Sequence, residues 1–332
     1  MASMKVTSGC LWVLLVMSSA TTGGLTAGSP PTAADPYYFN SAEPGCDGSD
    51  PNVVMCDDFE SGLWFSLNCD VANLSGGLLQ THGWCGTIFA NPITPPNAAV
   101  CGSKGVMGTN CAATYGTHVP GSETENSVNM ADHDLAPNHT SYANLYVRYY
   151  YKADPGFQWG AMKMVTFNNC CAGVPGIKWG NFSFNCAIGE ATPTAYLTMG
   201  LAAEGICQAQ NVGSDITIQS GRWYYFELHI NLGSVGGSDG VFEAWVNDCG
   251  TDGLQCQPPM TPTLRMRRAD VAWGRTSTTD LIGTVWFENW ANPVNSGTDY
   301  LDQIKVATVG PIGFMSRSGA RPPSSPSGLT IR

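Results

Sequence analysis

The stretch RWYYFELHINLGSVGGSDGVFEAWVN, residues 222–247, decides the fold of this chain. The apolar residues that alternate with polar and aromatic ones are Phe226, Leu228 and Ile230 in its first half and Phe242, Ala244 and Val246 in its second. Successive side chains of a β-strand point to opposite faces, so this alternation predicts two strands with one apolar face each. The Gly- and Ser-rich segment 232–240 predicts the loop that joins them as a hairpin.

The opposite face of this hairpin combines aromatic rings, carboxylates and an imidazole. Its members are Tyr225, Glu227, His229, Glu243 and Trp245. Such groups can stack on a sugar and form hydrogen bonds with it. The alternative is a solvated sheet face that carries these residues without a ligand.

The whole chain has the composition of an all-β protein. Among 332 residues, only 12% are charged. Glycine (39) and proline (21) are abundant and separate short segments in which apolar and polar residues alternate. Further strands are expected at residues 53–60, 144–152, 161–168, 281–290 and 300–308. These features predict an all-β protein, and the length allows one large β-domain as readily as two smaller domains.

The N-terminus indicates secretion. Lys5, the apolar run CLWVLLVM at 10–17 and small residues ending at Ala20 are typical of a signal peptide, with Ala27 as a second cleavage candidate. The expected organisation is a signal peptide at 1–20, a flexible lead-in at 21–48, the β-domain at 49–314 and a Pro/Ser-rich tail at 315–332. The run is too short to span a bilayer, so we expect an extracellular protein without membrane insertion.

The net charge limits the classes of ligand that the protein can bind, and the cysteines indicate the compartment in which it folds. The net charge of −11 becomes −12 without Lys5, which argues against nucleic acid and, unless a local basic patch overrides it, against an acidic polymer. The only basic cluster is Arg265, Arg267 and Arg268. Removal of Cys10 from 13 cysteines leaves an even number, which favours disulfides in a secreted chain. The spacings suggest Cys46–Cys56, Cys69–Cys85, Cys101–Cys111 and Cys249–Cys256, with Cys170 and Cys171 paired to Cys186 and Cys207 in either order.

A series of short motifs, taken in order, resembles the concanavalin A-like lectin/glucanase jelly roll. The motifs are Asp58-Phe59-Glu60, then Trp223, Glu227, Asn231, Asp239-Gly240 and Trp245, then Asp302, Ile304 and Val306. The branch of alginate- and glucuronan-lyase-like proteins is nearest, because a strand at 144–152 precedes Gly156-Phe157-Gln158-Trp159 and Lys163. The Gly-Gly-Lys run of those lyases is Ala161-Met162-Lys163 here. The resemblance implies two antiparallel sheets packed face to face, with a carbohydrate cleft on one of them.

A uronate lyase needs a group that neutralises the carboxylate, a base for the C5 proton and an acid for the leaving oxygen. Arg148 or Lys163 are candidates for the first role, His229, Tyr150 or Lys163 for the second, and a tyrosine for the third. The alternatives are that Arg148 is a surface cation, that Lys163 is a lysine at the rim of the sheet, and that His229 is a solvent-exposed histidine. Glu227 and Glu243 also suggest a glycoside hydrolase, but its E-x-D-x-x-E spacing is absent, so hydrolysis ranks below elimination.

Two further sets of residues complete the predicted site. Tyr225, Glu227, Trp245, Trp286, Glu288 and Trp290 are the candidates for substrate binding, with Val285 and Phe287 facing the core. Asp58, Glu60 and Asp302, on the first and last strands, are candidates for a structural Ca²⁺ or are ordinary surface acids. The chemistry itself requires no cofactor.

The leading hypothesis is a secreted jelly roll that acts on a polysaccharide, as a lyase that cleaves a uronate-containing glycan by β-elimination. The second hypothesis is a non-catalytic lectin-like or cell-surface attachment module, and the third is a structural secreted protein without a glycan ligand.

Overall fold

The computed structural model describes residues 38–60, 84–85, 98–101, 104–116, 128–134, 141–160, 162–168, 178–184, 193–201, 205–210, 216–291 and 297–315, and for some strand residues the backbone alone. The predicted signal peptide and residues 316–332 lie outside these ranges. Residues 38–48, within the predicted lead-in, contribute a strand to the domain. In the described part of the chain the helical structure consists of one 3₁₀ turn, Val106–Gly108, and no helix there is long and apolar enough to cross a membrane.

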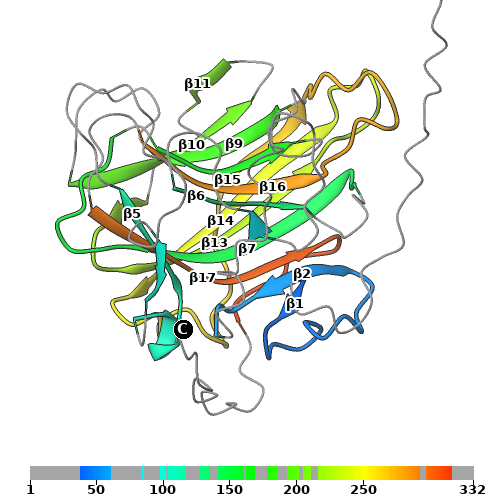
Figure 1. The fold of residues 1–332 in the computed structure, drawn as a ribbon. Helices are drawn as coiled ribbons and strands as arrows, with labels where there is room; N and C mark the ends of the chain where they lie inside the picture. The colour runs from blue at the N-terminus through cyan, green and yellow to red at the C-terminus, as the bar shows by residue number, and fades with distance from the viewer. Residues whose placement is uncertain are drawn as a thin grey trace, which may run out of the picture.

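The strands form two antiparallel-rich sheets, which we call sheet A and sheet B. Sheet A has nine strands in the order β1-β2-β17-β7-β13-β14-β15, with β5 paired to β17 and β4 to β5. Its strands are β1 (Phe39–Asn40), β2 (Val53–Asp57), β4 (Ala98–Val100), β5 (Ala112–Gly116), β7 (Asn144–Ala153), β13 (Trp223–Asn231), β14 (Gly240–Gly250), β15 (Leu264–Val271) and β17 (Gly297–Ala307). Figure 1 shows this sheet running from β15 to β1 at the lower right.

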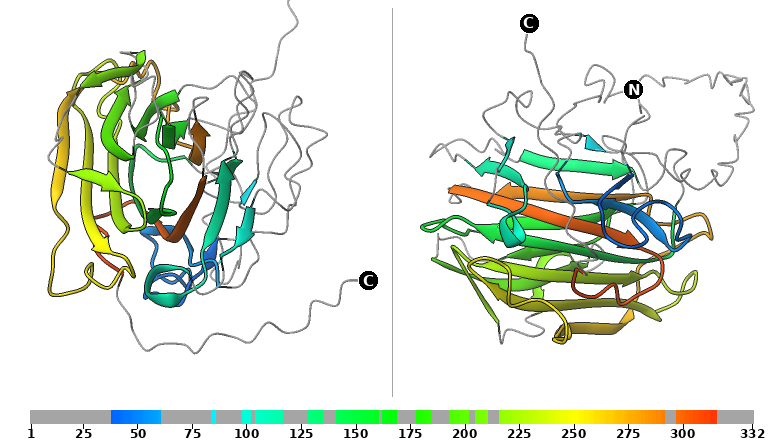
Figure 2. Two further views of the ribbon diagram at one scale, coloured as in Figure 1. Left: turned by 90° about the vertical axis from the view of Figure 1, so that its left-hand side faces the viewer. Right: turned by 90° about the horizontal axis from the view of Figure 1, so that it is seen from below.

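Sheet B has eight strands in the order β11-β10-β9-β8-β16-β6-β3, with β12 paired to β10. Its strands are β3 (Trp84–Cys85), β6 (Val128–Asp134), β8 (Met162–Asn168), β9 (Lys178–Phe184), β10 (Thr194–Leu201), β11 (Gly205–Gln210), β12 (Thr217–Gln219) and β16 (Thr284–Ala291). The strands are seen from the side and from below in Figure 2.

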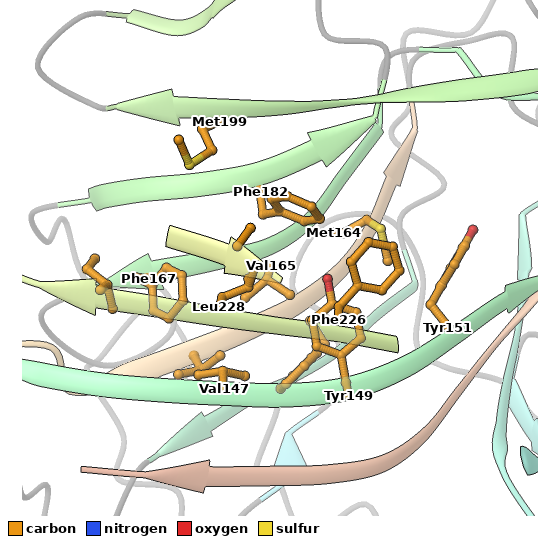
Figure 3. Close-up of a cluster of buried hydrophobic side chains, with 14 of the residues drawn as sticks. Val147, Tyr149, Tyr151, Met164, Val165, Phe167, Phe182, Met199, Phe226 and Leu228 are labelled. Carbon is orange, nitrogen blue, oxygen red and sulfur yellow. The ribbon is translucent and has the colours of Figure 1, made fainter. Parts of the chain in front are cut away.

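The apolar faces of the two sheets meet in one core. Sheet A contributes Val147, Tyr149, Tyr151, Phe226 and Leu228, and sheet B contributes Met164, Val165, Phe167, Phe182 and Met199 (Figure 3). Edge-to-face ring contacts join the sheets, with centroid distances of 5.5 Å between Phe182 and Phe226 and 5.6 Å between Tyr149 and Phe287. The predicted β-sandwich is therefore confirmed, and the predicted hairpin is β13 and β14, paired from Trp223 to Asn231.

The position of the last strand and the disulfides can also be compared with the sequence-based predictions. The last strand, β17, lies between β2 and β7, so Asp302 on β17 and the segment after β2 that carries Asp58 and Glu60 belong to neighbouring strands. The disulfides Cys46–Cys56, Cys101–Cys111 and Cys249–Cys256 are confirmed, which is consistent with an extracellular protein. The other predicted pairs involve residues outside the described parts of the chain.

Candidate functional site

The predicted site residues are divided between the two sheets. Arg148 and Tyr150 on β7, and the hairpin residues of β13 and β14, belong to sheet A, whereas Lys163 on β8 and the tryptophans of β16 belong to sheet B. Phe226 and Leu228 face the core, so Tyr225, Glu227 and His229 lie on the outer face of sheet A. The backbone positions of the candidates are therefore divided between two sheets that pack on opposite sides of the core.

Glu227 lies on the outer face of sheet A beneath the C-terminal strap, residues 308–315. Its carboxylate accepts hydrogen bonds from the backbone amides of Ile312 (2.6 Å) and Gly313 (3.0 Å), and also from the hydroxyl of Tyr225. The Tyr225 ring meets Phe314 edge-on, with 4.7 Å between centroids, and burial raises the pKa of Tyr225 well above its usual value. Glu227 is fully buried, so it holds the strap in place rather than facing a ligand.

Arg148 and Tyr150 are also occupied by groups of this chain. The guanidinium of Arg148 forms a two-pronged, buried ion pair with Glu43 and donates to the backbone oxygen of Gln303 (3.3 Å). Burial disfavours the cation and Glu43 favours it, and the balance leaves the pKa of Arg148 above its ordinary value. The Tyr150 hydroxyl accepts a hydrogen bond from the Met315 amide (3.1 Å), and burial raises its pKa to about 12. Neither side chain is available to a substrate in this structure.

His229 belongs to a cross-strand row on the same face. Its Nδ1 lies 2.7 Å from Glu243 Oε2 and its Nε2 lies 2.8 Å from Asn144 Oδ1. The ring stacks on Tyr146, with 4.1 Å between centroids and 3° between planes. Glu243 Oε1 also lies 3.2 Å from Arg267 Nε. The row is nearer to solvent than Glu227, but both nitrogens of its imidazole already face oxygen atoms.

The carboxylates that were candidates for calcium binding have partners within the protein. Asp302 is buried and accepts hydrogen bonds from the Val106 amide (2.8 Å), while Glu60 accepts one from the Asn110 amide (2.7 Å). Asp58 accepts a hydrogen bond from the Glu60 amide (3.1 Å). Burial raises the pKa of Asp302 well above its usual value. Among the described residues no group of three His, Cys, Asp or Glu side chains has a geometry that could hold a metal ion, so calcium binding stays a prediction.

The remaining candidates lie on neighbouring strands of sheet B, where the backbone pairing gives their register. The backbone pairing sets Lys163 opposite Ser183 on one side and Trp290 on the other, and Ser183 opposite Thr198. In a second row, it sets Thr166 opposite Trp286 and Asn181. The side chains of Lys163, Trp286, Glu288 and Trp290 lie outside the described parts of the structure. Register shifts in β16 fall around Glu288, between Trp286 and Trp290.

Near these rows, three buried polar atoms have no hydrogen-bond partner among the described residues: Thr166 Oγ1, Asn168 Nδ2 and Ser183 Oγ. Thr166 and Ser183 each stand between two core residues of their strand, so they point away from the core. Sequence reasoning missed them, although a polar residue within an alternating apolar strand is the signal that marks such positions. Leaving a buried polar group unpaired costs roughly 1–3 kcal/mol, which sets these three atoms apart from the buried polar groups of the strands that have partners.

The fold is an all-β sandwich of two facing sheets, the arrangement that the resemblance to the concanavalin A-like jelly roll implies. The solved structures similar to it include the lyases that the sequence resembles. An endo-β-1,4-glucuronan lyase from the fungus Trichoderma reesei matches 68% of this chain and 92% of its own, with 16% identity and a TM-score of 0.44. An alginate lyase from Aplysia kurodai matches 64% of this chain and 88% of its own, with 9% identity and a TM-score of 0.42.

A β-glucanase catalytic domain from Podospora anserina matches 75% of this chain and 93% of its own, with 10% identity and a TM-score of 0.44. These similarities concern the arrangement of strands and carry no argument about activity. No protein-family model and no curated protein sequence matches the chain.

Proposed function

We propose that this protein binds or cleaves a polysaccharide at the outer face of sheet B. The observation that carries the proposal is the register of this face. The backbone pairs Lys163 with Ser183 and Trp290, and Trp286 with Thr166. Within the described part of the chain, the buried polar atoms Thr166 Oγ1, Asn168 Nδ2 and Ser183 Oγ have no hydrogen-bond partner. Indoles stack on sugar rings, and sugar hydroxyls can pair with such groups. The outer face of sheet A is the weaker candidate, because Arg148, Tyr150 and Glu227 are held by the chain itself.

The proposed chemistry is β-elimination on a uronate-containing glycan, with Lys163 as the group that neutralises the uronate carboxylate or removes the C5 proton. Arg148 and Tyr150 drop out of this proposal because their polar atoms are already used. The alternative is a non-catalytic binding module that uses the same face. It is supported by the two tryptophan positions, because stacking and hydrogen bonding need no acid–base pair.

Incubation with glucuronan and with alginate tests the proposal, because elimination creates unsaturated ends that absorb ultraviolet light. The expected result is absorbance with a polyuronate, lost in Lys163→Ala and kept in Lys104→Ala, an exposed lysine on the 3₁₀-turn loop. Binding without absorbance, weakened by Trp290→Ala, would support the binding module. Full activity in Lys163→Ala would remove that residue from the mechanism, and the absence of both activity and binding would overturn the proposal.

A further inference from the structure

The only basic cluster of this acidic chain lies on β15, the terminal strand of sheet A. One of its members, Arg267, has a side chain that is 61% exposed. The cluster and the predicted catalytic lysine lie on different sheets, because β15 belongs to sheet A and β8 to sheet B. The proposed function leaves this cluster without a role.

Arg267 is anchored by one nitrogen and free at the other two. Its Nε lies 3.2 Å from Glu243 Oε1, and Glu243 Oε2 lies 2.7 Å from His229 Nδ1. His229 is itself fixed by Asn144 and by stacking on Tyr146. No partner for the terminal nitrogens of Arg267 is found in the described part of the chain. A guanidinium held in this way presents a ready-made fork of donors, the geometry that binds a carboxylate through two hydrogen bonds.

An aromatic platform adjoins this fork. Trp245 stands two residues beyond Glu243 on β14, on the same face, and is partly exposed. Its ring centroid lies 6.4 Å from that of Tyr146, and across the ladder it pairs with Leu264, which is 42% exposed. The backbone register therefore sets the indole opposite Leu264 and next to the row that carries Glu243 and Arg267.

A cationic fork beside an indole matches an acidic sugar, whose carboxylate pairs with arginine while its ring stacks on tryptophan. We infer that Trp245 and Arg267 form a second glycan-binding surface, which binds an acidic polysaccharide on the outer face of sheet A. It docks the polymer and takes no part in bond cleavage. The inference is independent of the proposed function, because the two surfaces lie on opposite sides of the core. The net charge of −11 repels a polyanion at long range, so attraction depends on this local cluster.

The test is affinity electrophoresis of the full chain in native gels that contain alginate or, as a neutral polymer, hydroxyethylcellulose. Lys163→Ala serves as the background, so that turnover does not alter the gel. The expected result is retardation by alginate alone, weakened roughly tenfold in apparent affinity by Arg267→Ala and by Trp245→Ala. Arg267→Lys should weaken it less, because it keeps the charge but not the fork.

Arg222→Gln is the matched control, because Arg222 is also anchored through Nε to a carboxylate, that of Asp248, at the far end of β13. This variant should bind like the background, and thermal unfolding should show that all variants fold. Unchanged binding in folded Arg267→Ala and Trp245→Ala variants would overturn the inference. Equal retardation by both polymers would also overturn it, because an arginine fork does not recognise a neutral chain. If binding appears only when Lys163 is present, sheet B is the sole glycan site and the second surface is refuted.

Discussion

Glu43 and Arg148 form a buried ion pair between residues 105 positions apart in the sequence. The side chains are 7% and 1% exposed, and the carboxylate engages both terminal nitrogens of the guanidinium. Lys305 Nζ lies 3.8 Å from the same carboxylate. The pair attaches the segment before β2 to the outer face of sheet A. It also explains why an arginine in a strand rich in tyrosine need not serve a substrate.

Removing either partner of this pair should destabilise the fold. Glu43→Gln leaves a buried cation without its counter-charge, which costs about 3–5 kcal/mol. Arg148→Met should cost a similar amount, whereas the double variant should recover part of the loss, because the buried guanidinium is then removed together with its counter-charge. Urea unfolding measures these changes. Arg222→Gln, which breaks the half-exposed Arg222–Asp248 pair, should cost no more than about 1 kcal/mol.

The attachment of the strap to Glu227 should be visible in hydrogen exchange. Glu227→Gln replaces one of two acceptor oxygens with a donor that faces the amide of Ile312 or Gly313. The free energy of local opening at the two amides should then fall by about 2 kcal/mol, so both amides should exchange faster. Amides of β13 should keep their protection. Faster exchange throughout β13 would mean that Glu227 supports the sheet rather than the strap.

Alternation could be read from the sequence because it is local. The apolar positions of 222–247 fixed both strands and the faces of their side chains, and short loop spacings identified three disulfides. What alternation cannot give is the sheet to which a strand belongs. β7 and β8 follow each other in the chain and have similar patterns, yet one pairs with β13 and the other with β16. Arg148 and Lys163 therefore looked like members of one site.

The hydrogen-bond partners of the buried polar groups could not be predicted either, because sequence patterns are local and these partners are distant in the sequence. Glu43 lies in a segment whose composition suggests flexibility, and the strap has no periodicity that indicates a contact with Glu227. Their positions depend on pairing over long sequence distances. Thr166 and Ser183 were accessible to local reasoning, because each interrupts an apolar strand, but only the structure shows that they lack partners.

The stability of the fold should respond to pH through Asp302. Burial raises the pKa of this carboxyl well above its unfolded value, so the folded state favours the protonated form. The stabilisation from this group is therefore complete below the unfolded pKa and is lost as pH rises through the folded pKa. Asp302→Asn, which stays neutral, should show a smaller loss of Tm than the wild type across that range. The measurements should be made in buffer that contains EDTA, so that no divalent cation neutralises the Asp302 carboxylate. Parallel Tm curves would mean that Asp302 is not the group responsible.

Two threonines of sheet B offer a matched pair for testing the unpartnered face. Thr166 and Thr198 are almost equally buried, at 3% and 4%, and both precede core residues on strands of the same sheet. Thr198 Oγ1 donates to the backbone oxygen of Ser183 (3.2 Å), whereas Thr166 Oγ1 has no partner among the residues that the structure describes.

Valine has nearly the shape of threonine, so the two substitutions isolate the hydroxyl. Thr198→Val should destabilise the fold by about 1 kcal/mol through the lost hydrogen bond, and Thr166→Val should leave stability unchanged or raise it by about 1 kcal/mol. If a glycan hydroxyl completes the missing bond, Thr166→Val should also weaken glycan binding by about 1 kcal/mol, although the variant is no less stable. Urea unfolding and gel retardation, measured on the same preparations, separate these effects. A Thr166→Val variant that loses stability as Thr198→Val does would show that its hydroxyl is already satisfied, and would remove the main support for placing the glycan on this face.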